Sequence, residues 1–406
     1  MITNCVALRR LFRVEAVAPL TSVVVAMAAF APVVVSGQES DARASAAAAA
    51  TTTDISYNNY RNPRGPWSIH VVRVPRQKSP FQVHAVHAQG RAVGLSRLSD
   101  HAAIMHSATA IPVAAINGDF YERGGPFAGD PRGLQIGEGE LISAPSGSVS
   151  FWIDALGEPH ATNTTSLLQV TWPDGASFPA GLNGARERNG IELYTSKLGA
   201  ATRTSGGREL VLEQSGNSLW APLRPGRAYK AKVREVREGG SSRVADGTVV
   251  LSIGPTAART VPSVQPGAEL VISTMTSPSL RGAKTAISGG PVLVRDGKRQ
   301  RISMPDSDDY EFSSMMERHP RSAVGWNDQF FFLVQVDGRQ RNSVGMTLNE
   351  LGSYLVELGC QGAMSLDGGG SATLWYDGRV RNRPCDGYER PIANSLVVTK
   401  RKDAEP

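Results

Sequence analysis

Cysteine and lysine are both scarce in this chain, which has 3 cysteines and 8 lysines among 406 residues. So few cysteines exclude a disulfide-stabilised scaffold, and the paired Cys-x-x-Cys motifs of a zinc ribbon or an iron–sulfur site are absent. The 35 arginines are scattered among 37 acidic residues without a dense basic run. Despite a pI near 9.3, duplex nucleic acid is therefore not an expected partner.

Several common catalytic motifs are also missing. The chain has no G-x-x-x-x-G-K-[ST] phosphate loop, no G-x-G-x-x-G leading into a helix, no G-x-S-x-G elbow and no H-E-x-x-H. These absences exclude the P-loop enzymes, dinucleotide-binding folds, common serine hydrolases and zinc proteases. Hydrophobic residues nevertheless make up 41% of the chain, which is enough for a sizeable core.

The first 59 residues read as a targeting segment followed by a linker. Arg9, Arg10 and Arg13 precede an almost wholly apolar stretch over residues 16–35, and small residues follow. This pattern predicts a signal peptide over residues 1–37, with an uncleaved membrane anchor as the alternative and either Sec or twin-arginine export. Residues 38–59, rich in Ala, Ser and Thr, predict a flexible linker. We therefore expect export to the periplasm, the cell surface or the medium, and no stable membrane insertion if the signal is cleaved.

Residues 60–400 predict a single main domain of the α+β class, with β-rich mixed sheets and a few packed helices, followed by a short tail over residues 401–406. Short apolar runs separated by Asp-Gly and other turn signals are typical of strands. The expected strands cover residues 67–74, 81–88, 112–117, 149–153, 228–236, 249–253, 330–336, 372–376 and 395–399.

Two segments have the apolar spacing of helices. One covers residues 97–106, and the other begins at Thr347. The Thr347 hydroxyl and Glu350 form the pattern of a capping box, leucines then recur at helical spacing, and Gly359 ends the run. We expect the second helix to pack on a sheet and to position the segment that follows.

That following segment, residues 365–375, is the most informative in the chain. It has three consecutive glycines, Gly368, Gly369 and Gly370, which are costly to order and are tolerated where the backbone approaches something closely. Their amides, with the hydroxyls of Ser371 and Thr373, predict a concave nest for anionic oxygen. Asp367 would then serve as a base, a nucleophile or a cation ligand. A plain hairpin is the alternative.

Three other loops have a similar character. Residues 115–121 end an apolar strand in an Asn-Gly turn, residues 288–291 form a glycine corner, and residues 318–325 place two arginines before a strand. Each is compatible with ordinary turn chemistry when it is considered alone.

With the glycine-rich segment, these loops resemble the phosphodiester glycosidases. The matching pieces occur in the order typical of that family, and Leu-Asp-Gly-Gly-Gly-Ser is the most specific of them. They cover residues 115–121, 133–143, 190–196, 288–297, 318–327, 336–358, 365–373 and 389–396. The resemblance implies hydrolysis of a sugar phosphodiester, such as a GlcNAc-1-phosphodiester on a glycan or polysaccharide. Asp119 departs from the small residue of many relatives and is counted with the substrate-binding residues.

Roles follow from the chemistry of such a substrate. A phosphate leaves the anomeric carbon readily, so the site needs an anion cradle and one carboxylate that activates water or attacks carbon. Asp367 is the first choice for this carboxylate and Glu389 the second. Arg321 and Arg390 would neutralise the phosphate, unless Arg390 and Glu389 simply form an ion pair. Asn117 and Asn394 would orient sugar hydroxyls.

Two other functions remain open. A phosphodiesterase that cuts the P–O bond would hold a divalent cation on Asp119, Asp130 and Asp367, whereas the glycosidase needs no cofactor. A non-catalytic glycan-binding module would instead stack sugars on exposed aromatic rings. Its candidate platforms are Trp152, Trp326, Trp375 and Tyr121.

Two details complete the sequence-based expectations. In an oxidising compartment Cys360 and Cys385 would pair across the Asp367 segment, contributing roughly 3 kcal/mol. The excess of arginine over lysine and the abundant alanine favour a GC-rich bacterial source. An envelope or extracellular polysaccharide is then the expected substrate.

Overall fold

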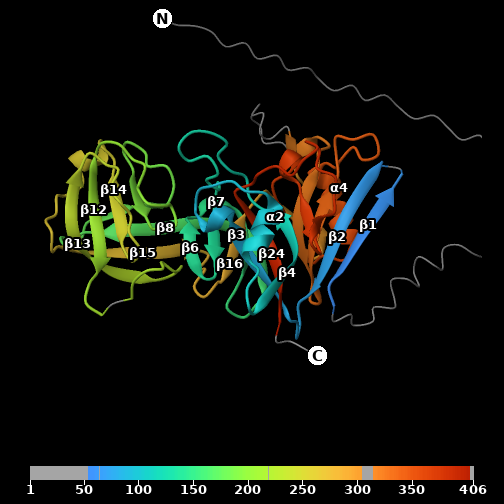
Figure 1. Cartoon of the computed structure of the whole chain (residues 1–406), viewed down its shortest axis with the longest axis horizontal. Coiled ribbons are helices and arrows are strands. Elements are labelled where there is room, and N and C mark those ends of the chain that lie inside the picture. The colour runs from blue at the N-terminus through green and yellow to red at the C-terminus, as the bar shows by residue number, and fades with distance from the viewer. Residues whose placement is uncertain (1–53, 64, 218, 304–313, 403–406) are drawn as a thin grey trace, which may run out of the picture. The chain divides into compact units, whose positions relative to one another are not determined.

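The computed structural model describes residues 54–63, 65–217, 219–303 and 314–402. These residues belong to one compact unit (Figure 1). The predicted signal peptide and most of the predicted linker lie outside the described residues. The linker was predicted to reach residue 59, but β1 (Ser56–Asn62) already begins at Ser56, because this segment pairs along its length with β2 (Trp67–Pro75).

The strands form three sheets. The seven-stranded sheet has the order β1, β2, β20 (Phe330–Val336), β19 (Arg321–Trp326), β21 (Gly362–Ser365), β17 (Val292–Arg295) and β18 (Lys298–Arg299). The five-stranded sheet has the order β23 (Arg379–Val380), β22 (Leu374–Tyr376), β4 (Ala110–Asn117), β24 (Asn394–Arg401) and β3 (Phe81–His87).

The third sheet has twelve strands. Its order is β10 (Gly181–Leu182), β11 (Ile191–Tyr194), β14 (Val249–Ile253), β12 (Arg208–Gln214), β13 (Ala228–Glu238), β15 (Glu269–Ser277), β8 (Pro159–Thr171), β7 (Ser146–Ile153), β16 (Thr285–Ser288), β5 (Gln135–Gly137) and β6 (Glu140–Ser143), with β9 (Ser177–Pro179) paired to β8.

Two helices and two sheets form four layers. The leucines of α4 (Leu348–Glu357) pack on the seven-stranded sheet at Val71 and Val334. The next residues along these strands face the other way, so that Val72 and Leu333 meet the five-stranded sheet. On the far side of that sheet lies α2 (Leu98–Ile104). Figure 1 shows α2 beside β4 and β24, and α4 contacts β17, β18 and β21 of the seven-stranded sheet. The layer order is thus helix, sheet, sheet, helix.

The twelve-stranded sheet has a separate core. Strands β13 and β15 alternate buried and exposed residues, which is typical of a sheet with one wet face. Their inner residues, such as Tyr229 and Ile272, share one cluster with Leu193, Leu210 and Leu251 from strands across the sheet. The sheet therefore curls around its own apolar interior.

The sequence predicted most of these elements. β14 and β20 have the expected bounds, and α4 has the predicted capping box at Thr347 and Glu350. Few helices and abundant strands are confirmed. The pairs of the seven-stranded and five-stranded sheets are all antiparallel, and the twelve-stranded sheet is mixed because β10 and β11 are parallel. Within the described residues, no helix has the length and apolar character needed to cross a membrane.

Candidate functional site

The Asp367 turn lies where the two layered sheets meet. Its backbone is held from both sides, because the Asp367 amide donates to the Gly118 carbonyl (2.8 Å) and the Gly369 amide to the Pro320 carbonyl (2.9 Å). Gly118 follows β4 of one sheet, and Pro320 precedes β19 of the other. Asp367 is 8% exposed. Segments about 250 residues apart in the chain thus converge on one carboxyl.

Close contacts or the backbone conformation favour glycine at each of the three positions of the turn. A Cβ on Gly368 would lie 2.7 Å from the Pro320 carbonyl oxygen, and one on Gly370 would overlap the Arg390 guanidinium. Gly369 has a φ of +59°, which glycine adopts without strain. Of the three glycine amides predicted to form a nest, that of Gly369 donates to a protein carbonyl, as do the amides of Ser371 and of the next residue along the chain. The glycines serve close packing.

A second carboxyl, Asp119, lies beside the first. Its backbone amide donates to Asn394 Oδ1 (2.7 Å), and its Oδ1 accepts from the Phe120 amide (2.8 Å). Its Oδ2 is buried without a hydrogen-bond partner in the described structure. Burial raises the pKa of Asp119 to about 8, with the Phe120 amide acting in the opposite direction and the nearby Asp367 adding to the effect of burial. Asp119 therefore carries a proton at neutral pH.

Asp367 is in a better environment for a negative charge. Burial raises its pKa, but the nearby Ser371 hydroxyl and the positive charges of Arg123 and Arg390 act in the opposite direction. The charge of Asp367 raises the pKa of Asp119, whereas Asp119 is not among the groups that shift the pKa of Asp367, so Asp367 is the carboxyl of the pair that ionises first.

Two unpaired hydroxyls complete the polar interior of the site. Ser371 is 1% exposed and Thr373 is fully buried, and neither hydroxyl oxygen has a hydrogen-bond partner within the described residues. Buried polar atoms are rarely left unpaired in native proteins. With Asp119 Oδ2, these atoms form a group of unsatisfied oxygens around Asp367, as expected where a polar ligand binds.

Arg321 contributes a buried positive charge. It donates to the carbonyl oxygens of Met346 (2.8 Å), Ser314 (2.6 Å) and Glu317 (2.7 Å). Burial lowers its pKa to about 10, while Asp367 acts in the opposite direction. Arg321 therefore remains protonated at neutral pH, next to Asp367 and without a carboxylate partner among the described residues.

Two further arginines were missed by the sequence analysis. Arg339 follows an Asp-Gly turn signal, has a φ of +59°, and places its guanidinium over Gly369. Its hydrogen-bond partners are His319 Nδ1 (3.3 Å) and Cys385 Sγ (3.9 Å), not a carboxylate. Arg123 also acts on Asp367. A strained non-glycine backbone beside a glycine turn is typical of functional sites, but φ is not readable from the sequence.

Glu389 and Arg390 have different partners from those predicted. The Glu389 carboxylate accepts from the Ser99 amide (2.6 Å) and hydroxyl (2.9 Å), and so caps the first turn of α2. Both of its oxygens are used there, which argues against a catalytic role. Arg390 pairs with Asp386 Oδ2 (2.7 Å), so the predicted ion pair with Glu389 is wrong.

The two asparagines support the turn. Asn117 donates to the Asp367 carbonyl (2.7 Å) and accepts from the Ser322 hydroxyl (2.6 Å) and the Thr373 amide (3.1 Å). Asn394 accepts from the Asp119 amide and donates to Gln135 Oε1 (2.9 Å). Both amides are fully buried and bonded to protein, so they position the carboxyls rather than orient a sugar.

The three aspartates predicted to bind a metal are not grouped. Asp130 lies near Glu122 and Glu192, and its pKa is raised to about 7 by burial, with Glu122 adding to the shift. Across the described residues, no group of three or more His, Cys, Asp or Glu side chains is arranged to hold a metal ion.

The predicted disulfide is absent from the structure. Cys360 is buried in the apolar cluster under α4, whereas Cys385 lies near Arg339, and both are free thiols.

The prediction that three tryptophans and one tyrosine form stacking platforms for sugars is wrong as well, because their rings are divided among three apolar clusters. Trp152 lies in the core of the curled sheet, Trp326 packs between the layered sheets, and Trp375 and Tyr121 pack under α2.

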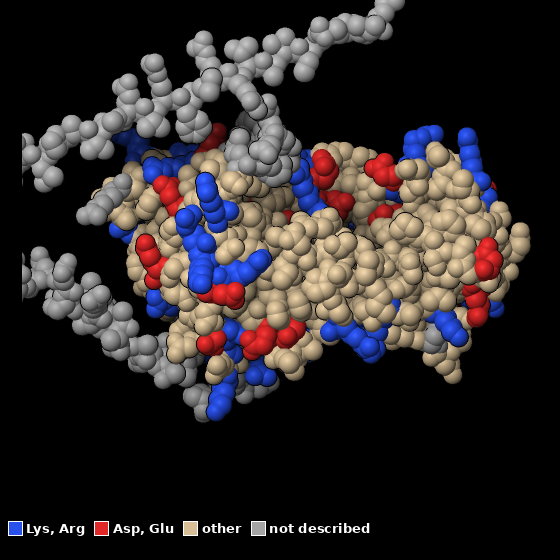
Figure 2. Space-filling model, turned by 180° about the vertical axis from the view of Figure 1, so that it is seen from behind, with Lys and Arg blue, Asp and Glu red and all other residues tan. Residues whose placement is uncertain are grey.

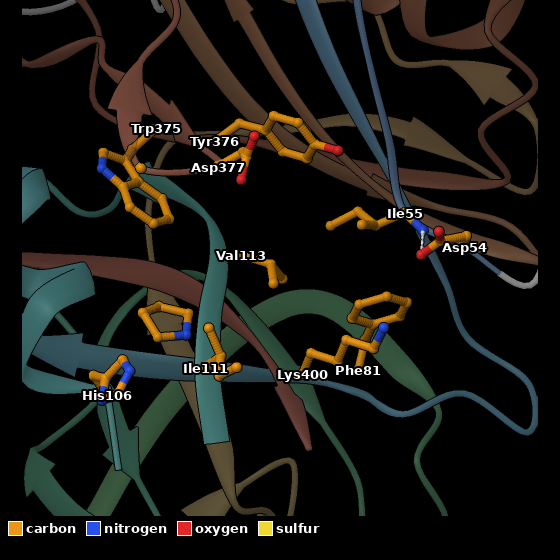
Figure 3. A pocket seen from close by; sticks show the side chains of 12 residues that line it. Asp54, Ile55, Phe81, His106, Ile111, Val113, Trp375, Tyr376, Asp377 and Lys400 are labelled. Atoms are coloured by element: carbon orange, nitrogen blue, oxygen red, sulfur yellow. Dashed lines mark hydrogen bonds between the residues drawn. The ribbon is translucent and has the colours of Figure 1, made fainter. Parts of the chain in front are cut away.

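A hollow of about 460 Å³ lies at the opposite end of the five-stranded sheet from the Asp367 turn. Figure 3 shows Ile111, Val113, Phe81 and Lys400 around it. These residues belong to the ends of β3, β4 and β24 that point away from Asn117 and Asn394. The size of a hollow is thus a poor guide to the reacting groups here.

Charges on the described surface are mixed. In Figure 2, basic and acidic side chains are interspersed over the described part of the face shown, without a broad patch of either sign.

Comparisons with known proteins agree with the motifs. The family model described as phosphodiester glycosidase matches residues 226–399, which include the Asp367 turn, Arg321 and Arg390. The SPβ prophage-derived uncharacterized protein YomE of Bacillus subtilis is 32% identical over 120 residues, or 29% of this chain. The chain matches only 18% of the length of that relative.

Two solved structures share the fold. A hypothetical protein from Synechocystis has a TM-score of 0.68 at 19% identity and covers 86% of this chain and 62% of its own. A Burkholderia pseudomallei protein, whose name classes it among exported proteins, has a TM-score of 0.64 at 20% identity and covers 82% and 74%. Residues 226–399 match the phosphodiester glycosidase family, which confirms the resemblance predicted from the sequence.

Proposed function

We propose that this protein is a hydrolase that cleaves the glycosidic C–O bond of a sugar-1-phosphodiester, releasing the sugar and a phosphomonoester. The observation that carries this proposal is the environment of Asp367. A buried carboxyl with unpaired hydroxyls lies beside arginines that have no carboxylate partner among the described residues. The family match over the same turn supports it.

The arrangement suits departure of a phosphate. Arg321 and Arg339 would bind the phosphate oxygens and stabilise the charge that grows as the C–O bond breaks. Asp367 would accept the proton of a water that attacks the anomeric carbon, or attack that carbon itself. The hydroxyls of Ser371 and Thr373 would hydrogen-bond the sugar or the phosphate. The bonding electrons leave with the phosphate oxygen, so little acid assistance is needed.

The N-terminal sequence bears on the compartment in which the protein acts. We propose that the chain is exported and that its substrate is a GlcNAc-1-phosphodiester-like linkage of an envelope or extracellular polysaccharide. The signal-like residues 1–37 support export.

Isotope labelling tests the reaction. The full chain is incubated with a GlcNAc-1-phospho-6-mannose diester in oxygen-18 water, and both products are weighed by mass spectrometry. We expect the label in the freed N-acetylglucosamine, because water attacks carbon. Label in the phosphate would show P–O cleavage and replace this proposal with a phosphodiesterase. Binding of the glycan without turnover would point to a binding module.

A further inference from the structure

Asp119 differs from the other site residues in both sequence and environment. It lies outside residues 226–399, so the family match does not account for it. It is 4% exposed, yet its Oδ2 has no hydrogen-bond partner among the described residues. A buried unpaired carboxyl oxygen is costly, and such an atom calls for a role.

The backbone forces Asp119 close to Asp367. The residue before Asp119, Gly118, accepts the Asp367 amide at 2.8 Å and donates to the Asn394 carbonyl at 3.0 Å. A Cβ on Gly118 would overlap Asn394, so this approach requires glycine. Asn394 Oδ1 then holds the Asp119 amide at 2.7 Å. The two carboxyls are thus brought together by fixed main-chain contacts from β4, β21 and β24.

The charged neighbours of the pair are unequal. Asp119 faces Asp367 and Arg132, and the hydrogen bond from the Phe120 amide partly offsets its burial. The Ser371 hydroxyl, the Gly368 amide and the charges of Arg123 and Arg390 all lower the pKa of Asp367. When two close carboxyls have unequal support, one proton stays on the less supported member.

We propose that Asp119 is a positioning residue that holds the single proton of the Asp119–Asp367 pair, keeping the anion site at one negative charge and so setting the alkaline limit of anion binding. This inference rests on the proposed function, because it assumes that the arginines around Asp367 bind the anionic part of the substrate. Loss of the Asp119 proton would place a second negative charge in the same dry site and repel the anion. Burial raises the pKa of Asp119 to about 8, which gives the region where this limit is expected.

Inorganic sulfate is a suitable probe because it keeps its double charge between pH 6 and 10 and needs no turnover. Its dissociation constant is measured by calorimetry on the full chain, on Asp119→Asn and on Asp130→Asn. Asn retains the acceptor for the Phe120 amide and cannot lose a proton in this range. Asp130 also has a raised pKa, to about 7, but it is not among the groups that shift the pKa of Asp367. Asp130→Asn is therefore the matched control.

In the wild type and in Asp130→Asn we expect sulfate affinity to fall about tenfold from pH 7 to pH 9. The reason is that Asp119 then adds a second negative charge close to the sulfate in a partly screened site. In Asp119→Asn the affinity should stay constant over this range. The alkaline limb of kcat/KM for the diester should disappear in the same variant.

Three results would overturn the inference. A pH-independent affinity in the wild type, or an equal fall in Asp119→Asn, would show that Asp119 does not control the anion site. No sulfate binding at any pH would reject both the inference and the arginine cradle. Turnover of the diester with C–O cleavage but an unchanged alkaline limb in Asp119→Asn would reject the inference alone and leave the proposed function standing.

Discussion

The two ends of the five-stranded sheet differ in what they bury. At one end, Asp119, Asp367, Ser371 and Thr373 are almost completely buried, and three of them have an unpaired oxygen within the described residues. At the other end, a hollow of about 460 Å³ is lined largely by apolar side chains, with Ile111 40% exposed. Burial of unpaired polar atoms costs free energy at the first end of the sheet, whereas the second end carries no such cost. We therefore place the candidate site at the unpaired buried oxygens around Asp367 rather than at the open hollow.

The largest expected effect is at Asp367. Asp367→Asn should lower kcat/KM for the sugar phosphodiester by about a thousandfold, because the amide can neither accept a proton from water nor attack carbon. The control is Asp377→Asn at the hollow, which should retain nearly full activity. Circular dichroism and thermal melting verify that both variants fold. Equal activity of the two variants would remove the functional difference between the ends.

The buried histidines behind the site should make stability depend on pH. Burial lowers the pKa of His87 and of His101 to about 4. An unfolded chain binds these protons more tightly, so the stabilisation is complete above about pH 6.5 and is lost as the pH falls toward 4. Relative to His101→Asn, the wild type should lose about 3 kcal/mol of unfolding free energy over this range.

Urea titrations at several pH values measure this loss. The buried carboxyls with raised pKa values make stability depend on pH in the opposite direction to the histidines. Because the wild type and the variant share these carboxyls, their contribution cancels when the two proteins are compared. His106→Asn, at an exposed histidine, is the control and should follow the wild type. A constant difference between the wild type and His101→Asn would contradict the expectation.

Gly368→Ala tests the close packing of the turn. Its methyl group would lie 2.7 Å from the Pro320 carbonyl oxygen, which belongs to the backbone and cannot rotate away, so we expect a loss of about 2 kcal/mol in unfolding free energy. The matched control is Gly124→Ala, because a Cβ there meets nothing within 4 Å and φ is not positive. Chemical denaturation measures both, and equal stability of the two variants would show that the turn relaxes easily.

The smallest effect is expected at the hollow. Ile111→Ser removes an exposed apolar side chain from its lining and should change kcat/KM for the diester by less than about twofold, since surface substitutions away from the reacting groups are usually mild. Initial rates over a range of diester concentrations measure this. A large rise in KM would extend the substrate site to this end of the sheet.

The candidate site was predicted in part from the sequence. Asp367, its glycines and Arg321 were identified because a glycine run and neighbouring arginines are local patterns. Glu389 was the second choice for the catalytic carboxylate, but its partner is Ser99, 290 residues away along the chain. The role of Arg339 depends on a backbone angle and on its position over Gly369, neither of which a one-dimensional pattern contains.

The sequence alone determined the β-rich class, the capped helix at Thr347, the Asp367 turn and the family resemblance, because hydrophobic periodicity, capping and turn chemistry act over a few residues. The tertiary structure decided which groups meet. It placed Asp119 beside Asp367, paired Arg390 with Asp386, and left Cys360 and Cys385 apart. These outcomes depend on how two sheets and two helices pack, and packing brings together residues that are hundreds of positions apart in the chain.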